Sequence, residues 1–307
     1  RIFPYKPGIF FGRITMKPKT KKRLTVLIFL SPWIITFFVF ELYPLLYSLF
    51  VSFTKYSGLN PQATFIGLEN YARAFQDEVF IKSVLNTLIF VAGTLPFTIA
   101  IAILIAILLN HLNLKFNGLF KAGFFLPSMI SMVVISMIWI YMYSGTGFFN
   151  TVLHFFGFAV EERSWLANQN TALGSIMIMD VWASFGYYMI LIYAGLQNIP
   201  YSVYEAARID GAKPIQIAFK ITIPMIRPTL FFVIALNTIR SFQIFTEVFT
   251  MTNGGPRNST ETIVHYLYRV SFRNYEMGYG SAIAYILLAI IMTITLIQKR
   301  ALRSDYL

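Results

Sequence analysis

The sequence of 307 residues contains no cysteine, only three histidines and no glycine followed directly by lysine. The absence of cysteine excludes disulfides and thiolate metal sites. The absence of a Gly-Lys step excludes the loop that cradles phosphates in P-loop ATPases. His111, His154 and His265 are far apart and lack the spacing of metal ligands. No catalytic triad or acid pair is indicated by spacing, so any ATP hydrolysis linked to this chain would belong to another chain.

Charge is also scarce, since 12% of the residues are charged whereas 57% are hydrophobic. Apolar runs longer than about 18 residues with almost no charge are long enough to cross a hydrocarbon core of about 30 Å as helices. The sequence therefore predicts an all-α, polytopic membrane protein with six transmembrane helices, joined by loops that include 54–82 and 144–171. The expected spans are 24–53 with bends at Pro32 and Pro44, 84–109, 122–143, 172–196, 229–251 and 277–297.

The 25 Lys and Arg residues are distributed unevenly over this arrangement. Six spans put both termini on one side, together with segments 110–121 and 197–228. These four segments carry 17 Lys and Arg residues, against 7 in the opposite loops. Because Lys and Arg are enriched in cytoplasmic loops, we expect both termini and segment 197–228 in the cytoplasm. The net charge of +12 then requires no nucleic-acid partner, and the basic residues 1–23 are expected to lie partly on membrane lipid.

Segment 197–228 is a polar island between two long apolar runs, and its local chemistry predicts helix, turn, helix. Glu205-Ala206-Ala207-Arg208 are helix formers, and Gly211 is a natural C-terminal breaker. A second helix is expected to begin at Pro214, to have one apolar face and to stop at two prolines. The residues concerned are Ile215, Phe219 and Ile223 for the face, and Pro224 and Pro228 for the stop.

Over more than twenty positions this segment resembles the EAA loop of binding-protein-dependent ABC importer permeases, in the variant of the carbohydrate branch that includes the maltose permeases. The matching residues are Glu205-Ala206-Ala207, Asp210-Gly211-Ala212, Phe219, Ile221 and Pro224. The resemblance implies a six-span importer domain over 24–297 between tails 1–23 and 298–307. It further implies a multi-pass protein of the bacterial cytoplasmic (inner) membrane that moves a sugar or oligosaccharide by alternating access.

The resemblance also implies partners and a docking role for the coupling loop, which is segment 197–228. The partners are a second, homologous permease, two copies of an ABC ATPase that bind ATP and Mg, and an extracytoplasmic solute-binding protein. No cofactor is expected in this chain. In the resembled family the loop docks in a cleft of the ATPase with its glutamate facing an arginine, although a merely solvated loop would also explain the charges. The expected coupling residues are Glu205, Ala206, Ala207, Asp210 and Gly211.

Polar and ionisable residues within the predicted spans form the second candidate site, because such groups are costly at membrane depth unless they face protein or water. Sugars are bound by amide and hydroxyl groups together with flat aromatic faces. The expected substrate-binding residues are Asp180, Trp182, Ser184, Tyr187, Tyr188, Asn237, Arg240, Ser241 and Gln243, with Glu247 about two turns further outward. Arg240 suggests an anionic substrate, such as a uronate oligosaccharide or a sugar phosphate. Interhelical hydrogen bonds and a structural Asp180–Arg240 ion pair remain alternatives.

The external loops supply the third candidate site. Asn253-Gly254-Gly255-Pro256 is by its own chemistry a turn. Together with Thr260-Glu261-Thr262 it resembles the loop after the fifth span in the first permease of maltose- and glycerol-phosphate-type importers. Residues 66–71 and Trp165-Leu166 are similar to other positions of the family. The resemblance implies that Asn253, Gly254, Gly255 and Pro256 contact the solute-binding protein.

Two other classes of membrane protein remain open. A secondary transporter would couple through an ion-binding carboxylate in the spans, for which Asp180 is the only strong candidate. It would have no use for the alanine-rich coupling loop, and no inverted repeat is apparent. A membrane-embedded enzyme would need paired acids, or a nucleophile with a base, inside the spans. Within the resembled family, an importer of sugar phosphates is the alternative.

Overall fold

The computed structural model describes residues 18–111, 117–158 and 163–301, and the chain forms two compact units, 1–50 and 51–307. The expected tails 1–23 and 298–307 therefore lie partly outside the described residues. The first unit holds one long helical run, of which Thr25–Ser52 is long and apolar enough to cross a membrane. Its elements are α1 (Pro18–Thr36), the π-helical turn η1 (Phe37–Leu42) and most of α2 (Tyr43–Ser52).

The two prolines of this first span lie in different local structures. Pro32 is inside α1, whereas Pro44 directly follows the π-helical turn. In that turn the N–H of Tyr43 reaches back to the carbonyl of Phe38, one residue further than in an α-helix. A wider turn relieves the clash that a proline ring makes with the preceding turn.

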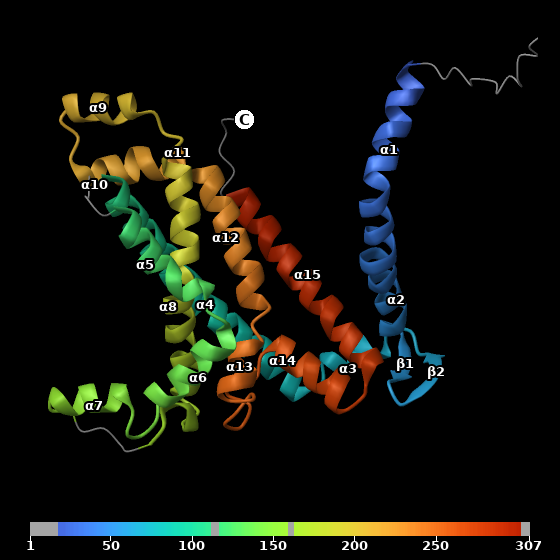
Figure 1. Ribbon diagram of the computed structural model, residues 1–307. Helices are drawn as coiled ribbons and strands as arrows, with labels where there is room; N and C mark the ends of the chain where they lie inside the picture. The colour runs from blue at the N-terminus through green and yellow to red at the C-terminus, as the bar shows by residue number, and fades with distance from the viewer. Residues whose placement is uncertain (1–17, 112–116, 159–162, 302–307) are drawn as a thin grey trace, which may run out of the picture. The chain divides into compact units, whose positions relative to one another are not determined.

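Four further spans of the second unit are helical where the sequence predicts them (Figure 1). Three of them are single helices, and the fourth is interrupted near its C-terminal end. They are α4 (Glu78–His111), α8 (Ala172–Leu196), α15 (Met277–Ala301), and α12 (Arg227–Phe242) followed by α13 (Thr246–Met251).

The predicted third span, 122–143, differs from the expected single helix. It consists of α5 (Asn117–Met129) and α6 (Met132–Met142), which are bent by 91° at the break between them. Ser131 begins α6 with a non-helical backbone, ψ 129°. The apolar composition continues through the break, so hydropathy gives no sign of it. The pair makes a sixth span if it crosses as one bent unit.

Segment 54–82, predicted as a polar loop, contains regular structure. β1 (Thr54–Ser57) pairs antiparallel with β2 (Asn60–Phe65), and α3 (Glu69–Ala74) follows. The buried Asn70 amide donates to two backbone carbonyls at the start of the hairpin, each at 2.9 Å. The Asn70 side chain thus joins α3 to the hairpin, and the segment has regular structure instead of forming an open loop.

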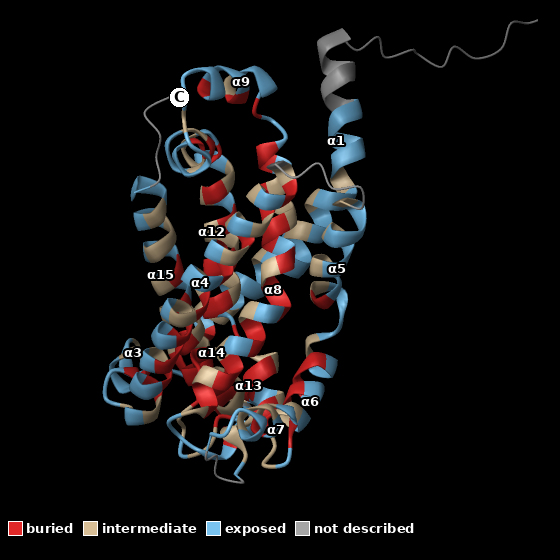
Figure 2. Ribbon diagram, turned by 90° about the vertical axis from the view of Figure 1, so that its left-hand side faces the viewer, coloured by how far each residue is buried: buried red, intermediate tan, exposed pale blue. Residues whose placement is uncertain are grey.

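α8 is buried along more of its length than the other candidate spans (Figure 2). Small residues let its neighbours approach closely. A Cβ on Gly186 would overlap the backbone of Phe124 on α5, and a Cβ on Gly195 would lie 2.7 Å from the Thr229 side chain on α12. Such contacts between small residues are typical of helix packing in membranes. α5 and α12 therefore both pack closely against α8.

The two ends of the second unit carry different elements (Figure 1). One end holds the coupling loop and the C-terminal end of α15. The other end, called the outer end below, holds α3, the hairpin and several short helices. The coupling elements are α9 (Tyr201–Ile209), α10 (Pro214–Ile217), the π-helical η3 (Ala218–Thr222) and α11 (Ile223–Met225). The other outer elements are α7 (Phe148–Phe155), η2 (Trp165–Ala167), α14 (Ile263–Tyr268) and η4 (Arg269–Arg273).

Candidate functional site

A cavity of about 590 Å³ is lined by α8, α12 and the break between α5 and α6. Its volume falls within the range of about 300–1,000 Å³ that small-molecule sites occupy. Most of the residues expected to bind substrate line it. They are Asp180, Ser184, Tyr187 and Tyr188 on α8, and Arg240, Ser241 and Gln243 at the end of α12. Two helices that pack against each other thus bring together side chains that are about sixty positions apart in the sequence.

Arg240 lies between two carboxylates in this cavity. Its Nη2 is 3.0 Å from Asp180 Oδ1 and 3.5 Å from Glu247 Oε1. The Arg240 side chain is 36% exposed, whereas those of Asp180 and Glu247 are 5% and 8% exposed. The Asp180–Arg240 ion pair is therefore confirmed, and a second carboxylate joins it. The group contains two carboxylates and one guanidinium, so the positive charge of Arg240 is already compensated.

Two of the expected substrate residues lie outside the cavity lining. Asn237 is buried one turn before Ser241, whose hydroxyl donates to Asn237 Oδ1 at 3.3 Å. Trp182 packs its ring 5.5 Å from that of Trp139 on α6. Asn237 therefore supports a lining residue from behind, and Trp182 belongs to the contact between α8 and α6. Four-residue spacing puts Asn237 and Ser241 on one helical face, but it does not distinguish the residue that faces the cavity from the residue behind it.

Residues at two helix breaks complete the lining, and their sequence pattern does not predict a place in the cavity. One set is at the break between α5 and α6, and the other is between α12 and α13. They include Pro127, Ser128, Ile130 and Met132 in the first, and Ile244, Phe245 and Thr246 in the second. Irregular backbone at membrane depth is tolerated where it is buried in protein or lines a cavity. Pro127, followed by Ser128 and Ser131, was the available sequence signal.

The coupling loop has the predicted helix, turn and helix. Gly211 has a φ of +77°, and the N–H of Ala212 reaches back to the carbonyl of Ala207 at 3.0 Å, which is a Schellman ending of α9. Glu205, Ala206, Asp210 and Gly211 are exposed, as expected for docking residues. Ala207 is an exception, because it is buried against the body of the protein.

The second helix of the coupling loop departs from expectation at its apolar face and its end. Ile215 and Phe219 are exposed, whereas Ile217 is the residue that packs inward. The helix also passes Pro224, since the π-helical η3 precedes that proline, and a bend at Ile226 then leads into α12. Ile215 and Phe219 are thus displayed on the surface, whereas Ile223 is partly buried and packs against the apolar cluster.

The coupling loop is packed on the spans that line the cavity. The buried Tyr204, Ala207 and Ile217 belong to one apolar cluster with residues of α4, α8 and α12. Among these are Tyr188 of the cavity wall and Leu196 at the end of α8. A displacement of the loop therefore moves buried side chains that are continuous with the cavity wall.

The outer turn Asn253-Gly254-Gly255-Pro256 follows α13 directly. Asn253 and Gly254 have positive φ values of 49° and 81°. Asn253 is exposed, Gly255 and Pro256 are partly exposed, and Gly254 is buried. Three of the four residues expected to contact a solute-binding protein are therefore accessible, and Gly254 faces the interior.

Comparisons with known proteins agree with this architecture. Residues 81–303 match the family model described as binding-protein-dependent transport system inner membrane component. The chain is 36% identical over 280 residues to the lactose transport system permease protein LacF of Rhizobium radiobacter, covering 90% of this chain and 93% of that protein. It is 33% identical over 282 residues to the arabinooligosaccharides transport system permease protein AraP of Bacillus subtilis, covering 91% and 88%. Among solved structures, its fold is similar to a chain of a bacterial alginate ABC transporter in complex with an alginate pentasaccharide-bound periplasmic protein, with a TM-score of 0.81, 23% identity and coverage of 93% and 96%.

Proposed function

Because the chain belongs to the family of binding-protein-dependent transport system inner membrane components, we propose that it is the permease subunit of an ATP-driven importer of a sugar or oligosaccharide. The observation that carries this proposal is the continuity between the cavity and the coupling loop. The polar cavity is lined by α8 and α12, and the coupling loop that joins these two helices packs on them. Lactose and arabinooligosaccharides in the names of relatives agree with a carbohydrate substrate.

The proposed mechanism is alternating access. A second, homologous permease would complete the translocation path beside the cavity, and two copies of an ABC ATPase would bind ATP and Mg and hydrolyse the ATP. Closure of the ATPase pair would move the coupling loop, and α8 and α12 would follow because they share a buried cluster with it. The cavity would then open to the outer side and receive sugar from a solute-binding protein.

The docking surface for the ATPase is proposed to be the exposed side of the coupling loop. Glu205 is exposed on α9, so its carboxylate is free of packing constraints and can accept a bidentate arginine from a partner. Asp210 and Gly211 lie at the turn beside it, and Ala206 leaves room for a close approach. Ala207 contributes from the inner side, where it fixes α9 to the spans.

We propose that the coupling loop and both termini face the cytoplasm of a bacterial cell and that the outer end faces the binding protein. The excess of Lys and Arg on the coupling side supports this orientation. The position of the C-terminal end of α15 beside the coupling loop agrees with it (Figure 1). The proposed domain is 24–297, between the short tails 1–23 and 298–307.

The charges in the cavity favour a neutral sugar. Arg240 is paired with Asp180 and Glu247, so its positive charge is compensated and an anionic sugar would approach two neighbouring carboxylates. An anionic substrate is the second candidate, because the 36% exposure of the Arg240 side chain leaves part of its guanidinium open to the cavity.

ATP hydrolysis by the reconstituted complex, with its binding protein, tests this proposal across neutral and acidic oligosaccharides. Stimulation by neutral sugars alone is expected. Stimulation by acidic sugars alone would reject the neutral substrate and assign Arg240 to anion binding. Absence of stimulation by every sugar would reject the carbohydrate substrate.

A further inference from the structure

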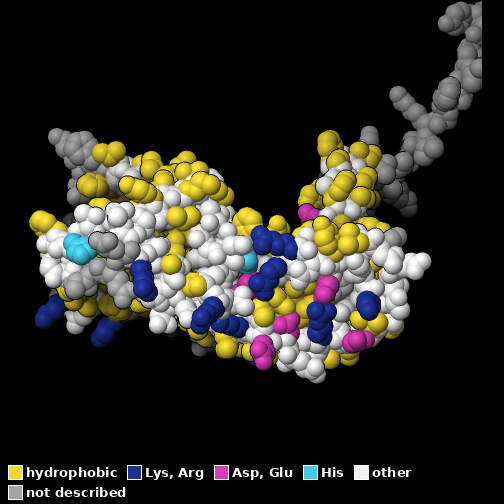
Figure 3. Space-filling view, turned by 90° about the horizontal axis from the view of Figure 1, so that it is seen from below, with side chains coloured by type: hydrophobic (Ala, Val, Ile, Leu, Met, Phe, Trp, Pro, Cys, Tyr) yellow, Lys and Arg dark blue, Asp and Glu magenta, His cyan; other side chains and the backbone are white. Residues whose placement is uncertain are grey.

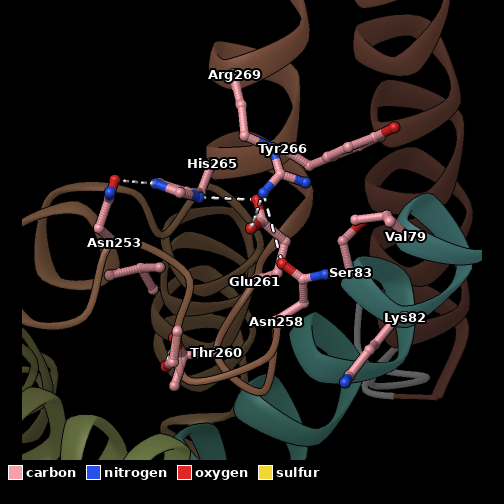
Figure 4. Close-up of polar contacts among 12 residues, drawn as sticks. Val79, Lys82, Ser83, Asn253, Asn258, Thr260, Glu261, His265, Tyr266 and Arg269 are labelled. Carbon is pink, nitrogen blue, oxygen red and sulfur yellow. Dashed lines mark hydrogen bonds and ion pairs between the residues drawn. The ribbon is translucent and has the colours of Figure 1, made fainter. Parts of the chain in front are cut away.

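The loop after α13 is held from inside by a buried polar cluster (Figure 4). The side chains of Glu261 and His265 are 0% and 1% exposed. Glu261 Oε1 accepts a hydrogen bond from His265 Nδ1 at 2.7 Å, and its Oε2 lies 3.1 Å from Arg269 Nη1. Glu261 lies two residues before α14, His265 lies within α14, and Arg269 begins η4, so the end of the loop and the helix after it supply the three side chains.

This cluster contacts both ends of the outer loop, residues 253–258. His265 Nε2 lies 3.3 Å from Asn253 Oδ1, and Arg269 Nη1 donates to Asn258 Oδ1 at 3.5 Å. Asn253, Arg257 and Asn258 have positive φ values of 49°, 51° and 58°, a region that asparagine tolerates and arginine seldom adopts. Gly254 between them is packed so tightly that a Cβ there would overlap the Glu261 carboxylate. The backbone of the loop therefore lies directly against the buried carboxylate of Glu261.

The same segment is fixed to the beginning of α4. Asn86 Nδ2 donates to the backbone oxygens of Asn258 and Glu261, at 2.9 and 3.0 Å. Lys82 Nζ donates to the backbone oxygen of Arg257 at 2.7 Å. The loop is thus supported by a span that belongs to the transmembrane body.

A further contact joins this segment to the wall of the cavity. Thr262, next to Glu261, donates its hydroxyl to the carbonyl of Ile244 at 3.2 Å. Ile244 lines the cavity and lies at the break before α13, the helix that carries Glu247. Through this hydrogen bond, the segment that follows the outer loop is linked directly to the cavity lining.

We propose that Glu261 is a positioning residue: its buried carboxylate holds residues 253–258 in the shape that the solute-binding protein docks against. The proposal rests on the proposed function, because it takes the outer end as the side from which sugar is delivered. A lone buried carboxylate is costly, whereas one paired with Arg269 and His265 can support a loop that has little apolar packing of its own. The face seen from the outer end displays Lys and Arg side chains with Asp and Glu side chains beside them (Figure 3).

The test uses the assembled complex with two variants and a matched control. Glu261→Gln removes the charge, and His265→Phe keeps a ring against Phe245 and Phe249 while it removes the contact to Asn253. Glu276→Gln is the control, because Glu276 is also ion-paired on the outer side, to Arg73 at 2.6 Å, but its side chain is 42% exposed. Hydrogen exchange of residues 253–261 is measured without the binding protein. ATP hydrolysis is then measured against binding-protein concentration.

We expect faster exchange of this segment in both variants, most strongly in Glu261→Gln. The binding-protein concentration for half-maximal stimulation should rise about tenfold in Glu261→Gln, as the loss of one charge-assisted hydrogen bond implies. Basal ATP hydrolysis and the control should be unchanged. Unchanged exchange in both variants would overturn the positioning role. Faster exchange with an unchanged half-maximal concentration would overturn the link to docking. A wild-type complex that no binding protein stimulates would instead contradict the proposed function.

Discussion

The coupling loop and the outer loop use acidic residues in opposite ways. In the coupling loop Glu205 and Asp210 are exposed, and the loop keeps its shape through Gly211 and through apolar contacts of Tyr204, Ala207 and Ile217. Beside the outer loop the carboxylate of Glu261 is fully buried, and its partners His265 and Arg269 contact both ends of the loop. Removing a buried charge destabilises the fold, whereas removing an exposed charge leaves the stability of the fold nearly unchanged. Under the proposed function, the difference separates residues expected to bind a partner from residues expected to shape a surface.

The largest effect is expected at the exposed carboxylate. Glu205→Ala should lower sugar-dependent ATP hydrolysis by about one to two orders of magnitude, because a charge-assisted hydrogen bond to a partner is worth about 1.5–3 kcal/mol. The thermal unfolding of the purified permease should not change, since Glu205 is exposed. Ser202→Ala, on the exposed side of the same helix α9, is the matched control. Full activity and normal co-purification of the ATPase with Glu205→Ala would remove Glu205 from the docking surface.

The next effect concerns the buried charges of the cavity. Asp180→Asn should destabilise the permease by about 3 kcal/mol, because it leaves Arg240 with only the more distant Glu247. The double variant Asp180→Asn, Arg240→Gln should recover only part of that loss, because it removes the Asp180–Arg240 pair together but leaves Glu247 without its guanidinium. Thermal unfolding of wild type, Asp180→Asn, Arg240→Gln and the double variant measures the coupling. Additive losses in the double variant would show that the ion pair does not stabilise the fold.

Two adjacent glycines give a finer comparison within the outer loop. Gly254→Ala should destabilise residues 253–261 more than Gly255→Ala. Gly254 has a φ of +81° and no room beside Glu261, whereas a Cβ on Gly255 would meet only the Thr252 carbonyl at 3.2 Å. The strain of a non-glycine residue at such a φ is about 1–2 kcal/mol. Hydrogen exchange on both variants measures the difference, and equal exchange rates would contradict the packing account.

The smallest effect is a dependence on acidity at the outer end. Burial opposes ionisation of Asp77, but hydrogen bonds from Tyr266 and Tyr279 and from two backbone amides outweigh it and lower its pKa. A lowered pKa stabilises the fold fully above the ordinary value of about 4, and that contribution is lost as the pH falls further. Unfolding of Asp77→Asn should therefore differ from wild type at neutral pH and approach it near pH 3. A constant difference over this range would reject the assignment.

Much of this arrangement follows from the sequence. Long apolar runs predict α4, α8, α12 and α15 because hydrophobic length is enough to specify a span. The turn at Gly211 and the start at Pro214 follow from local backbone chemistry, and both are confirmed.

The remaining features depend on tertiary contacts that composition does not encode. The break between α5 and α6 lies within an apolar run, and its irregular backbone is tolerated because it borders the cavity. The hairpin β1–β2 is joined to α3 by the amide of Asn70, a contact between residues 16 to 18 positions apart. The helical period groups Asn237 with Ser241, but only packing decides that Ser241 faces the cavity. Likewise, Ala207 lies inside a motif whose other expected docking residues are exposed.

Uptake of labelled oligosaccharide into vesicles tests the central claim most directly. The vesicle membrane contains the permease, its partner permease and the ATPase pair. The binding protein is added outside the vesicles. The account predicts uptake that requires ATP inside the vesicles, is lost in Glu205→Ala and is retained in Ser202→Ala. Uptake without ATP, driven by an ion gradient and abolished by Asp180→Asn, would contradict the account and identify a secondary transporter.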